Sequence, residues 1–253
     1  MNPKPFDLRD WLSDWQYDPE NTARIMHGSD GREIMQVRTP LGIEQFELQG
    51  RPDGLRPHNA DTALEFYQAK LARMESQGKS DSFSLNPTEC AELFEEGVLF
   101  YFRYLHLFQL RDWNRVIRDT SRNLSLFDFV HEHARREQDR NHLEQWRPYL
   151  LRMHTVARAM VEWDAGRHAT AIEIARKTIA TLDSLSDMEN ETFQVERQRS
   201  REALEDLLKQ IEKTQPVSEL ELLERELHKA VETEQFERAA SLRDRIRSLR
   251  THP

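Results

Sequence analysis

The spacing of apolar residues changes once along this chain of 253 residues, and that change limits the fold. Only within residues 1–57 do apolar residues recur with a period near two, which is typical of half-buried strands. From Asp61 onward the period is helical. We therefore expect a mainly α protein in three parts: a front element at 1–57 with a small β-hairpin, a helical body at 58–213, and an antiparallel helical hairpin at 217–251.

The predicted β-hairpin lies in the front element. Met35 and Val37, and later Phe46 and Leu48, alternate with polar residues. The turn between them is Thr39-Pro40-Leu41-Gly42, where proline presets φ and Gly42 tolerates a positive φ. A short helix is expected before the hairpin, and its apolar side chains need a surface to cover: Phe6, Trp11, Leu12 and Trp15.

Helical periodicity divides the body into several segments. The clearest start is Asn86-Pro87-Thr88-Glu89, which combines an N-cap, a proline at the first helical position and an acid three residues after the cap. That helix should run to about Leu110. The other helices are expected from Asp61 to a polar link at 76–85, and over 112–136, 142–165, 169–185 and 191–213.

Two helix pairs in the body resemble tetratricopeptide repeats, which are stacked helix-turn-helix units with concave binding surfaces. One pair contains Ala159–Gly166 followed by Ala171-Ile172, where small residues would let two helices approach closely. The other spans Tyr104–Leu124 and turns at Arg111-Asp112-Trp113. An irregular helical bundle without repeats is the alternative.

The C-terminal segment carries the most specific pattern. Ser218 and Glu221 form a predicted capping box, flanked by a hydrophobic staple of Val217 and Leu222. Apolar residues then recur at heptad spacing in two runs, Leu220, Leu223, Leu227 and Ala230, then Ala239, Leu242, Ile246 and Leu249. The short link between the runs predicts an antiparallel pair of helices, each with one apolar stripe. Two helices alone bury little surface, so we expect a partner on the exposed side.

This segment resembles the UVR motif, the C-terminal helical hairpin of two excinuclease subunits of bacterial nucleotide-excision repair and of some regulators of Clp-type proteases. The residues that carry the likeness are Leu227, Ala230, Phe236-Glu237, Ala239-Ala240, Leu242-Arg243-Asp244, Ile246 and Leu249. The resemblance implies a hairpin that binds another protein or a second copy of itself. The predicted partner-binding residues are Leu223, Leu227, Ala230, Phe236, Ala239, Ala240, Arg243, Asp244, Ile246 and Leu249, with Phe236 as the anchor.

Other functions of UVR proteins are not implied. The sequence has no GxxxxGK phosphate loop, and its single cysteine cannot supply a cysteine-based zinc site. A net charge of −9 argues against general DNA binding, so DNA would be reached only through a partner. The longest strongly apolar run, 97–102, is far shorter than a membrane span of about 20 residues. We expect a cytoplasmic, non-enzymatic adaptor without cofactors, linked to excision repair or to Clp-type proteolysis.

Arginines support an alternative function, an enzyme or a small-anion-binding protein. Arg32 lies where the chain enters the β-hairpin, Arg38 within it, and Arg51 in its exit loop, Gly50–Gly54. These three would converge on an anion. Arg111, Arg115, Arg118 and Arg122 are spaced four, three and four apart, which is one face of a helix. Such a face would hold phosphates or an acidic partner. The structural alternative for both sets is pairing with nearby acids.

Two further candidates are weaker. His131 and His133 are two residues apart on a predicted helix, so their imidazoles point away from each other and no metal site is expected. Asp128 is better placed relative to His131, but two ligands do not make a site. Cys90 lies in the first turn of its helix near Leu93, which favours a buried structural thiol over a nucleophile.

Overall fold

The computed structural model describes residues 7–214 and 219–251 and divides the chain into two compact units. The first unit comprises Met1–Lys209 and the second Gln210–Pro253. The chain is mainly helical with one small antiparallel sheet, which confirms the predicted fold class. No helix in the described ranges is long and apolar enough to cross a membrane.

The sheet has the order β1-β2-β3 and is antiparallel throughout. Strands β2 (Glu33–Thr39) and β3 (Gly42–Glu47) are the predicted hairpin. Their ends pair Thr39 with Gly42, so the turn is the two residues between them. Gly42 makes no use of a positive φ here, because it is the first residue of β3.

Strand β1 (Ala23–His27) was not predicted and pairs with β2. Its adjacent residues Ile25 and Met26 are both half-buried, so its burial does not alternate with period two. The sequence signal for a strand is therefore weak here.

The predicted short helix is α1 (Arg9–Asp14), and none of its residues is buried. Trp11 is exposed, which differs from the expectation that the aromatic side chains of this helix cover a surface. Trp15 follows the helix, and the Arg24 guanidinium lies 3.9 Å from the centre of its ring. Phe6 lies outside the described residues.

The helical body begins with α2 (Ala63–Ser76) and α3 (Pro87–Gln109). The predicted capping box of α3 is confirmed: Asn86 Oδ1 accepts from the amides of Thr88 and Glu89, and Glu89 Oε2 accepts from the Asn86 amide. The helices of the body are α2 (Ala63–Ser76), α3 (Pro87–Gln109), α4 (Trp113–His133), α5 (Glu137–Glu144), α6 (Arg147–Asp164), α7 (His168–Ser184) and α8 (Glu191–Thr214).

One predicted helix boundary is wrong. The helix expected from His142 to Ala165 is two helices, α5 and α6, separated at Gln145 and Trp146. Pro148 lies in the first turn of α6, where its missing amide proton costs no hydrogen bond. The pattern of apolar residues continues across this break, so periodicity alone does not reveal it.

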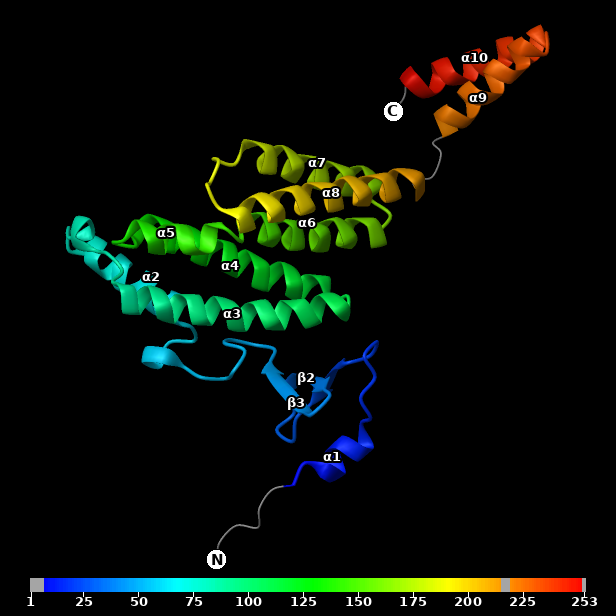
Figure 1. Cartoon of the computed structure of the whole chain (residues 1–253). Coiled ribbons are helices and arrows are strands. Elements are labelled where there is room, and N and C mark those ends of the chain that lie inside the picture. Colours follow the sequence, from blue (N-terminus) through cyan, green and yellow to red (C-terminus); the bar gives the residue numbers. More distant parts are fainter. Residues whose placement is uncertain (1–6, 215–218, 252–253) are drawn as a thin grey trace, which may run out of the picture. The chain divides into compact units, whose positions relative to one another are not determined.

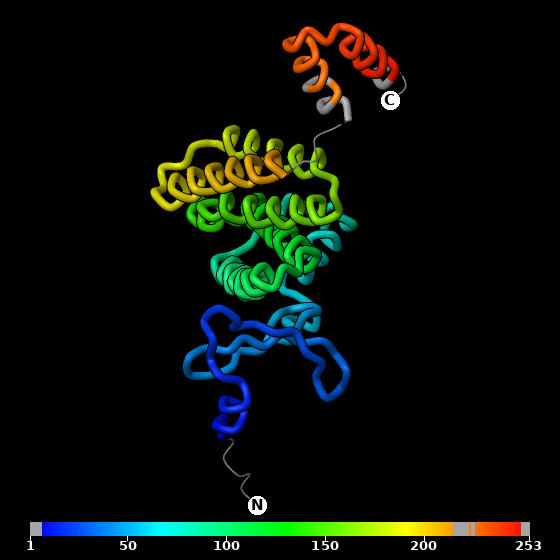
Figure 2. The backbone as a smooth tube through the Cα atoms, turned by 90° about the vertical axis from the view of Figure 1, so that its right-hand side faces the viewer, coloured from blue at the N-terminus to red at the C-terminus, as the bar shows by residue number. Residues whose placement is uncertain are grey.

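The first unit is layered (Figure 1, Figure 2). The sheet lies on one side of α3, while α6, α7 and α8 lie beyond α4. The apolar side of the sheet packs against the ends of α3 and α4 in one core, formed by Met35, Val37, Phe46, Leu48, Leu107, Val116 and Ala157. The predicted turns at Arg111 and Gly166 connect α3 to α4 and α6 to α7, and both residues have positive φ.

Buried charges join the sheet and its exit loop to the helices. Arg103 donates to both carboxylate oxygens of Asp119, at 2.7 and 2.8 Å, and to the carbonyl oxygens of Glu47 and Gly50 at 2.8 Å. Two turns earlier on α3, Glu96 is fully buried and accepts from the first two amides of α2. These contacts fix the exit loop and the start of α2 on α3.

His154 on α6 links folding to pH. Its Nδ1 lies 2.9 Å from Thr120 Oγ1 on α4, and burial lowers its pKa to about 4. In the unfolded chain the pKa of this histidine is about 6.5. Below about pH 6.5 the unfolded chain therefore binds more protons than the folded chain. As the pH falls from 7 to 5, we expect His154 to lower the free energy of unfolding by about 2 kcal/mol.

Urea unfolding of His154→Gln at both pH values tests this expectation, since the variant should lose that part of the pH dependence. His27→Gln, at an exposed position of β1, is the matched control and should keep it. An unchanged pH dependence in His154→Gln would contradict the assignment.

Candidate functional site

The C-terminal unit contains the predicted helical hairpin. Helix α9 (Glu219–Glu232) and helix α10 (Phe236–Thr251) are antiparallel neighbours joined by three residues. Glu234 in this link has a φ of 53°, and the Gln235 amide donates to the Ala230 carbonyl at 2.8 Å. A left-handed residue followed by this bond is a Schellman ending, which stops α9 and reverses the chain. The predicted capping box includes Ser218, which lies outside the described residues.

An apolar seam holds the two helices together. Leu223 and Ala230 on α9 are buried against Ala239, Leu242 and Ile246 on α10, and Leu227 is partly buried beside them. The two alanines are the smallest side chains of this seam. Five of the predicted partner-binding residues, Leu223, Leu227, Ala230, Ala239 and Ile246, therefore pack within the hairpin. The side chain of Leu249 lies outside the described residues.

The other predicted residues face outward. Phe236 is 69% exposed, and Val231, at the same end of the hairpin, is 51% exposed. Ala240 is exposed, as are the side chains of Arg243 and Asp244, which lie 4.0 Å apart. We call Phe236, Val231, Ala240, Arg243 and Asp244 the outer set. The structure thus separates the predicted residues into a seam that closes the hairpin and an outer set available to a partner.

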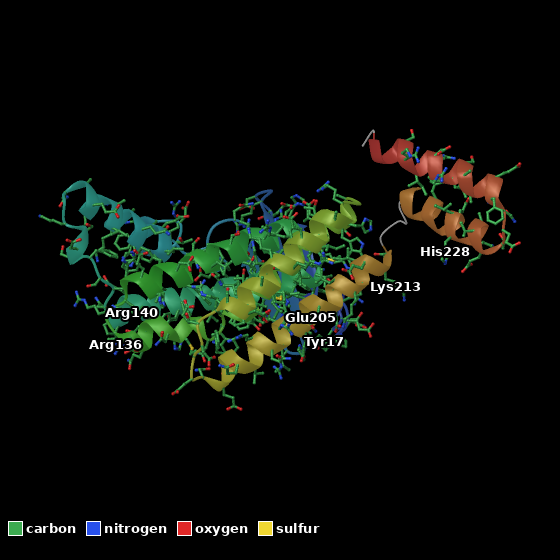
Figure 3. The ribbon with its side chains drawn as sticks, turned by 90° about the horizontal axis from the view of Figure 1, so that it is seen from above. Tyr17, Arg136, Arg140, Glu205, Lys213 and His228 are labelled. Atoms are coloured by element: carbon green, nitrogen blue, oxygen red, sulfur yellow. The ribbon has the colours of Figure 1, made fainter. Side chains whose placement is uncertain are left out.

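Two polar side-chain pairs lie on the exposed surface of the hairpin. Arg238 on α10 lies 3.4 Å from Glu226 on α9, and His228 lies 3.2 Å from Glu232 one turn along α9. His228 is labelled in Figure 3, and its side chain is exposed on α9. Exposed pairs of this kind stabilise little but can set the register of a docked helix.

The arginines of α4 contact parts of their own unit. Arg115 lies 2.6 Å from both Asp112 and Glu33, and Arg118 lies 2.9 Å from Asp119. Arg122 pairs with the buried Glu96. Arg111 is not on α4, because it occupies the left-handed turn before it. Asp119 is buried and pairs with both Arg103 and Arg118.

The arginines of the front element are also engaged. Arg32 pairs with Asp30 and lies 3.0 Å from Glu47, and Arg51 lies 2.9 Å from Asp53 and 3.3 Å from Glu96. Arg38 donates from Nε to the Trp15 carbonyl at 2.8 Å, and its Nη1 contacts the carbonyls of the hairpin turn. The structure thus joins Arg51 and Arg122 through Glu96, while Arg32 and Arg38 have other partners.

Glu96, Arg103 and Asp119 were missed as structural residues by sequence reasoning. Glu96 and Arg103 both occur within the apolar pattern of α3, which is the signal that would have found them. A charge at a core-facing position requires a buried opposite charge. Glu96 and Arg103 are not accessible to a ligand from solvent, because both side chains are buried.

The thiol and the histidines show no reactive geometry. Cys90 is buried, and burial raises its pKa to about 11, so the thiol stays protonated. His133 is half-buried against the rings of Phe83 and Phe129, while His131 is exposed. Among the described residues, no three potential metal ligands of the His, Cys, Asp or Glu type cluster together.

Comparison with known proteins bears on the hairpin. No curated protein and no solved structure matches the chain. The tetratricopeptide likeness of the two middle helix pairs is not confirmed. A family model described as the UvrB/uvrC motif matches residues 218–251, the segment that forms α9 and α10. The C-terminal hairpin therefore carries the UVR motif that its sequence predicted.

Proposed function

We propose that this protein is a non-enzymatic interaction adaptor that binds a partner through the outer set of its UVR hairpin. The observation that carries the proposal is Phe236, a large aromatic side chain that is 69% exposed on a hairpin whose own seam is already closed. Aromatic residues and arginine are enriched at protein–protein interfaces, where a few residues carry most of the binding energy.

The partner should present a helical surface of complementary chemistry. Phe236 and Val231 offer apolar contact at the turn end of the hairpin, and Ala240 lets a second backbone approach. Arg243 and Asp244 supply one charge of each sign. A second copy of this hairpin presents the same groups, so the partner is either a second copy of this chain or another UVR protein of excision repair or Clp-type proteolysis.

Affinity capture from the native cell tests the proposal. The intact chain is compared with a version that ends at Thr214, which keeps α8 and removes the hairpin. We expect the intact chain alone to recover a UVR-containing protein or an excision-repair or Clp component, and sedimentation velocity to report any self-association. Identical captured proteins and identical sedimentation for both versions would overturn the proposal.

A further inference from the structure

A cavity in the first unit lies apart from the hairpin. It has a volume of about 480 Å³ and is lined by residues of α3, α4, α6 and α8 and by the α5–α6 junction. Its walls are rich in aromatic rings, including Tyr101, Phe127 and Tyr149, and Trp146 lies at its edge with 45% of its surface exposed. A cavity of this size with an apolar lining is typical of sites for small molecules.

One wall of this cavity is polar. Glu196 on α8 is only 9% exposed, and its Oε1 accepts from Arg199 Nη1 at 3.4 Å. Its Oε2 is buried and has no hydrogen-bond partner among the described residues. Arg152 supplies a cation near that oxygen, with its Nη2 3.6 Å away. Buried carboxylate oxygens are normally hydrogen-bonded, so this one needs a donor.

The charges of this wall restrict the ligand. One carboxylate lies between two guanidinium groups, so a cationic ligand would meet two positive charges and an anionic one would face Glu196. A neutral group with an N–H donor for Glu196 and an acceptor for Arg152 fits both. The aromatic lining favours a flat ring, because rings stack offset or edge to face.

We propose that this cavity binds a planar heterocycle whose edge places an N–H next to a carbonyl group, the lactam edge of hypoxanthine, guanine or uracil. The N–H donates to Glu196 Oε2, and the carbonyl oxygen accepts from Arg152. Tyr149, whose ring lies 5.0 Å from the Arg152 guanidinium, and Tyr101 pack against the ring. This site is independent of the UVR hairpin.

Calorimetric titration of the full chain with inosine and adenosine tests the proposal. The two nucleosides share the ribose and the purine frame, but only inosine has the N–H and carbonyl edge. We expect saturable binding of inosine with a Kd at least about tenfold lower than that of adenosine. Undetectable inosine binding, or equal binding of the two nucleosides, would overturn the proposal.

Variants on α8 locate the site. Glu196→Leu removes the acceptor and should weaken inosine binding at least about tenfold. Glu205→Leu is the matched control: Glu205, labelled in Figure 3, also pairs with an arginine, Arg201 at 3.1 Å, but it is not among the residues that line the cavity. Unchanged inosine binding in Glu196→Leu would contradict the site. If that variant does not fold, the preference of the unaltered chain for inosine over adenosine decides the question.

Discussion

Replacing Arg103 by methionine should lower the free energy of unfolding of the first unit by about 3 kcal/mol. Arg103 is buried, and its guanidinium binds both oxygens of the buried Asp119. In the methionine variant, Arg118 remains as a partner of the Asp119 carboxylate, because its Nε lies 2.9 Å from Asp119 Oδ1. Breaking a buried pair by removing one partner costs about 3–5 kcal/mol, and we expect the lower part of this range because Arg118 remains.

The same substitution should loosen the sheet. The Arg103 guanidinium also binds the carbonyls of Glu47 and Gly50, which are the end of β3 and the exit loop. Without these bonds, hydrogen exchange of amides in β3 should accelerate more than that of amides in α7, which packs against α6. Urea unfolding followed by circular dichroism gives the global loss of stability.

Two further variants separate charge from packing. Arg167→Met removes an exposed pair with Glu162 and should change stability little, because surface ion pairs are screened by solvent. The double variant Arg103→Met/Asp119→Leu should regain much of the lost stability, because no buried charge is left unpaired. A loss in Arg103→Met no larger than in Arg167→Met would show that the buried pair does not hold the unit together.

Local signals explain which parts of the fold were predictable. The cap of α3 was predicted because all its groups, from Asn86 to Glu89, are adjacent in sequence. The seam of the C-terminal hairpin was predicted because heptad spacing places Leu223, Leu227 and Ala230 on one face. Strand β1 was missed because its burial does not alternate, and α5 because a helical pattern continues through the break.

The site was less predictable because spacing shows which residues share a face but not what lies opposite. Arg115, Arg118 and Arg122 do share one side of α4, yet β2, the exit loop and α3 supply acids and amides to it. In the hairpin, spacing did not separate Ala239 from Ala240. The first faces α9 and the second faces solvent, since neighbours on a helix are rotated by about 100°.

The two sides of the hairpin should respond differently to truncation. Leu242 is a buried seam residue, and replacing such a leucine by alanine costs about 2–5 kcal/mol. A pair of helices has little stability to lose, so Leu242→Ala should unfold α9 and α10 and abolish association with them. Phe236 is 69% exposed, so Phe236→Ala should leave the helices intact.

Association should nevertheless fall in Phe236→Ala. An aromatic anchor at the centre of an interface contributes about 2 kcal/mol or more, which corresponds to roughly a 30-fold weaker Kd. Arg243→Ala should weaken association while preserving helicity, since the Arg243 side chain is exposed. Helical content from circular dichroism and association from sedimentation velocity or partner binding should be measured on the same samples of all three variants. Loss of helicity in Phe236→Ala would place this ring in the hairpin core, and unchanged association in both Phe236→Ala and Arg243→Ala would show that the outer set does not bind the partner.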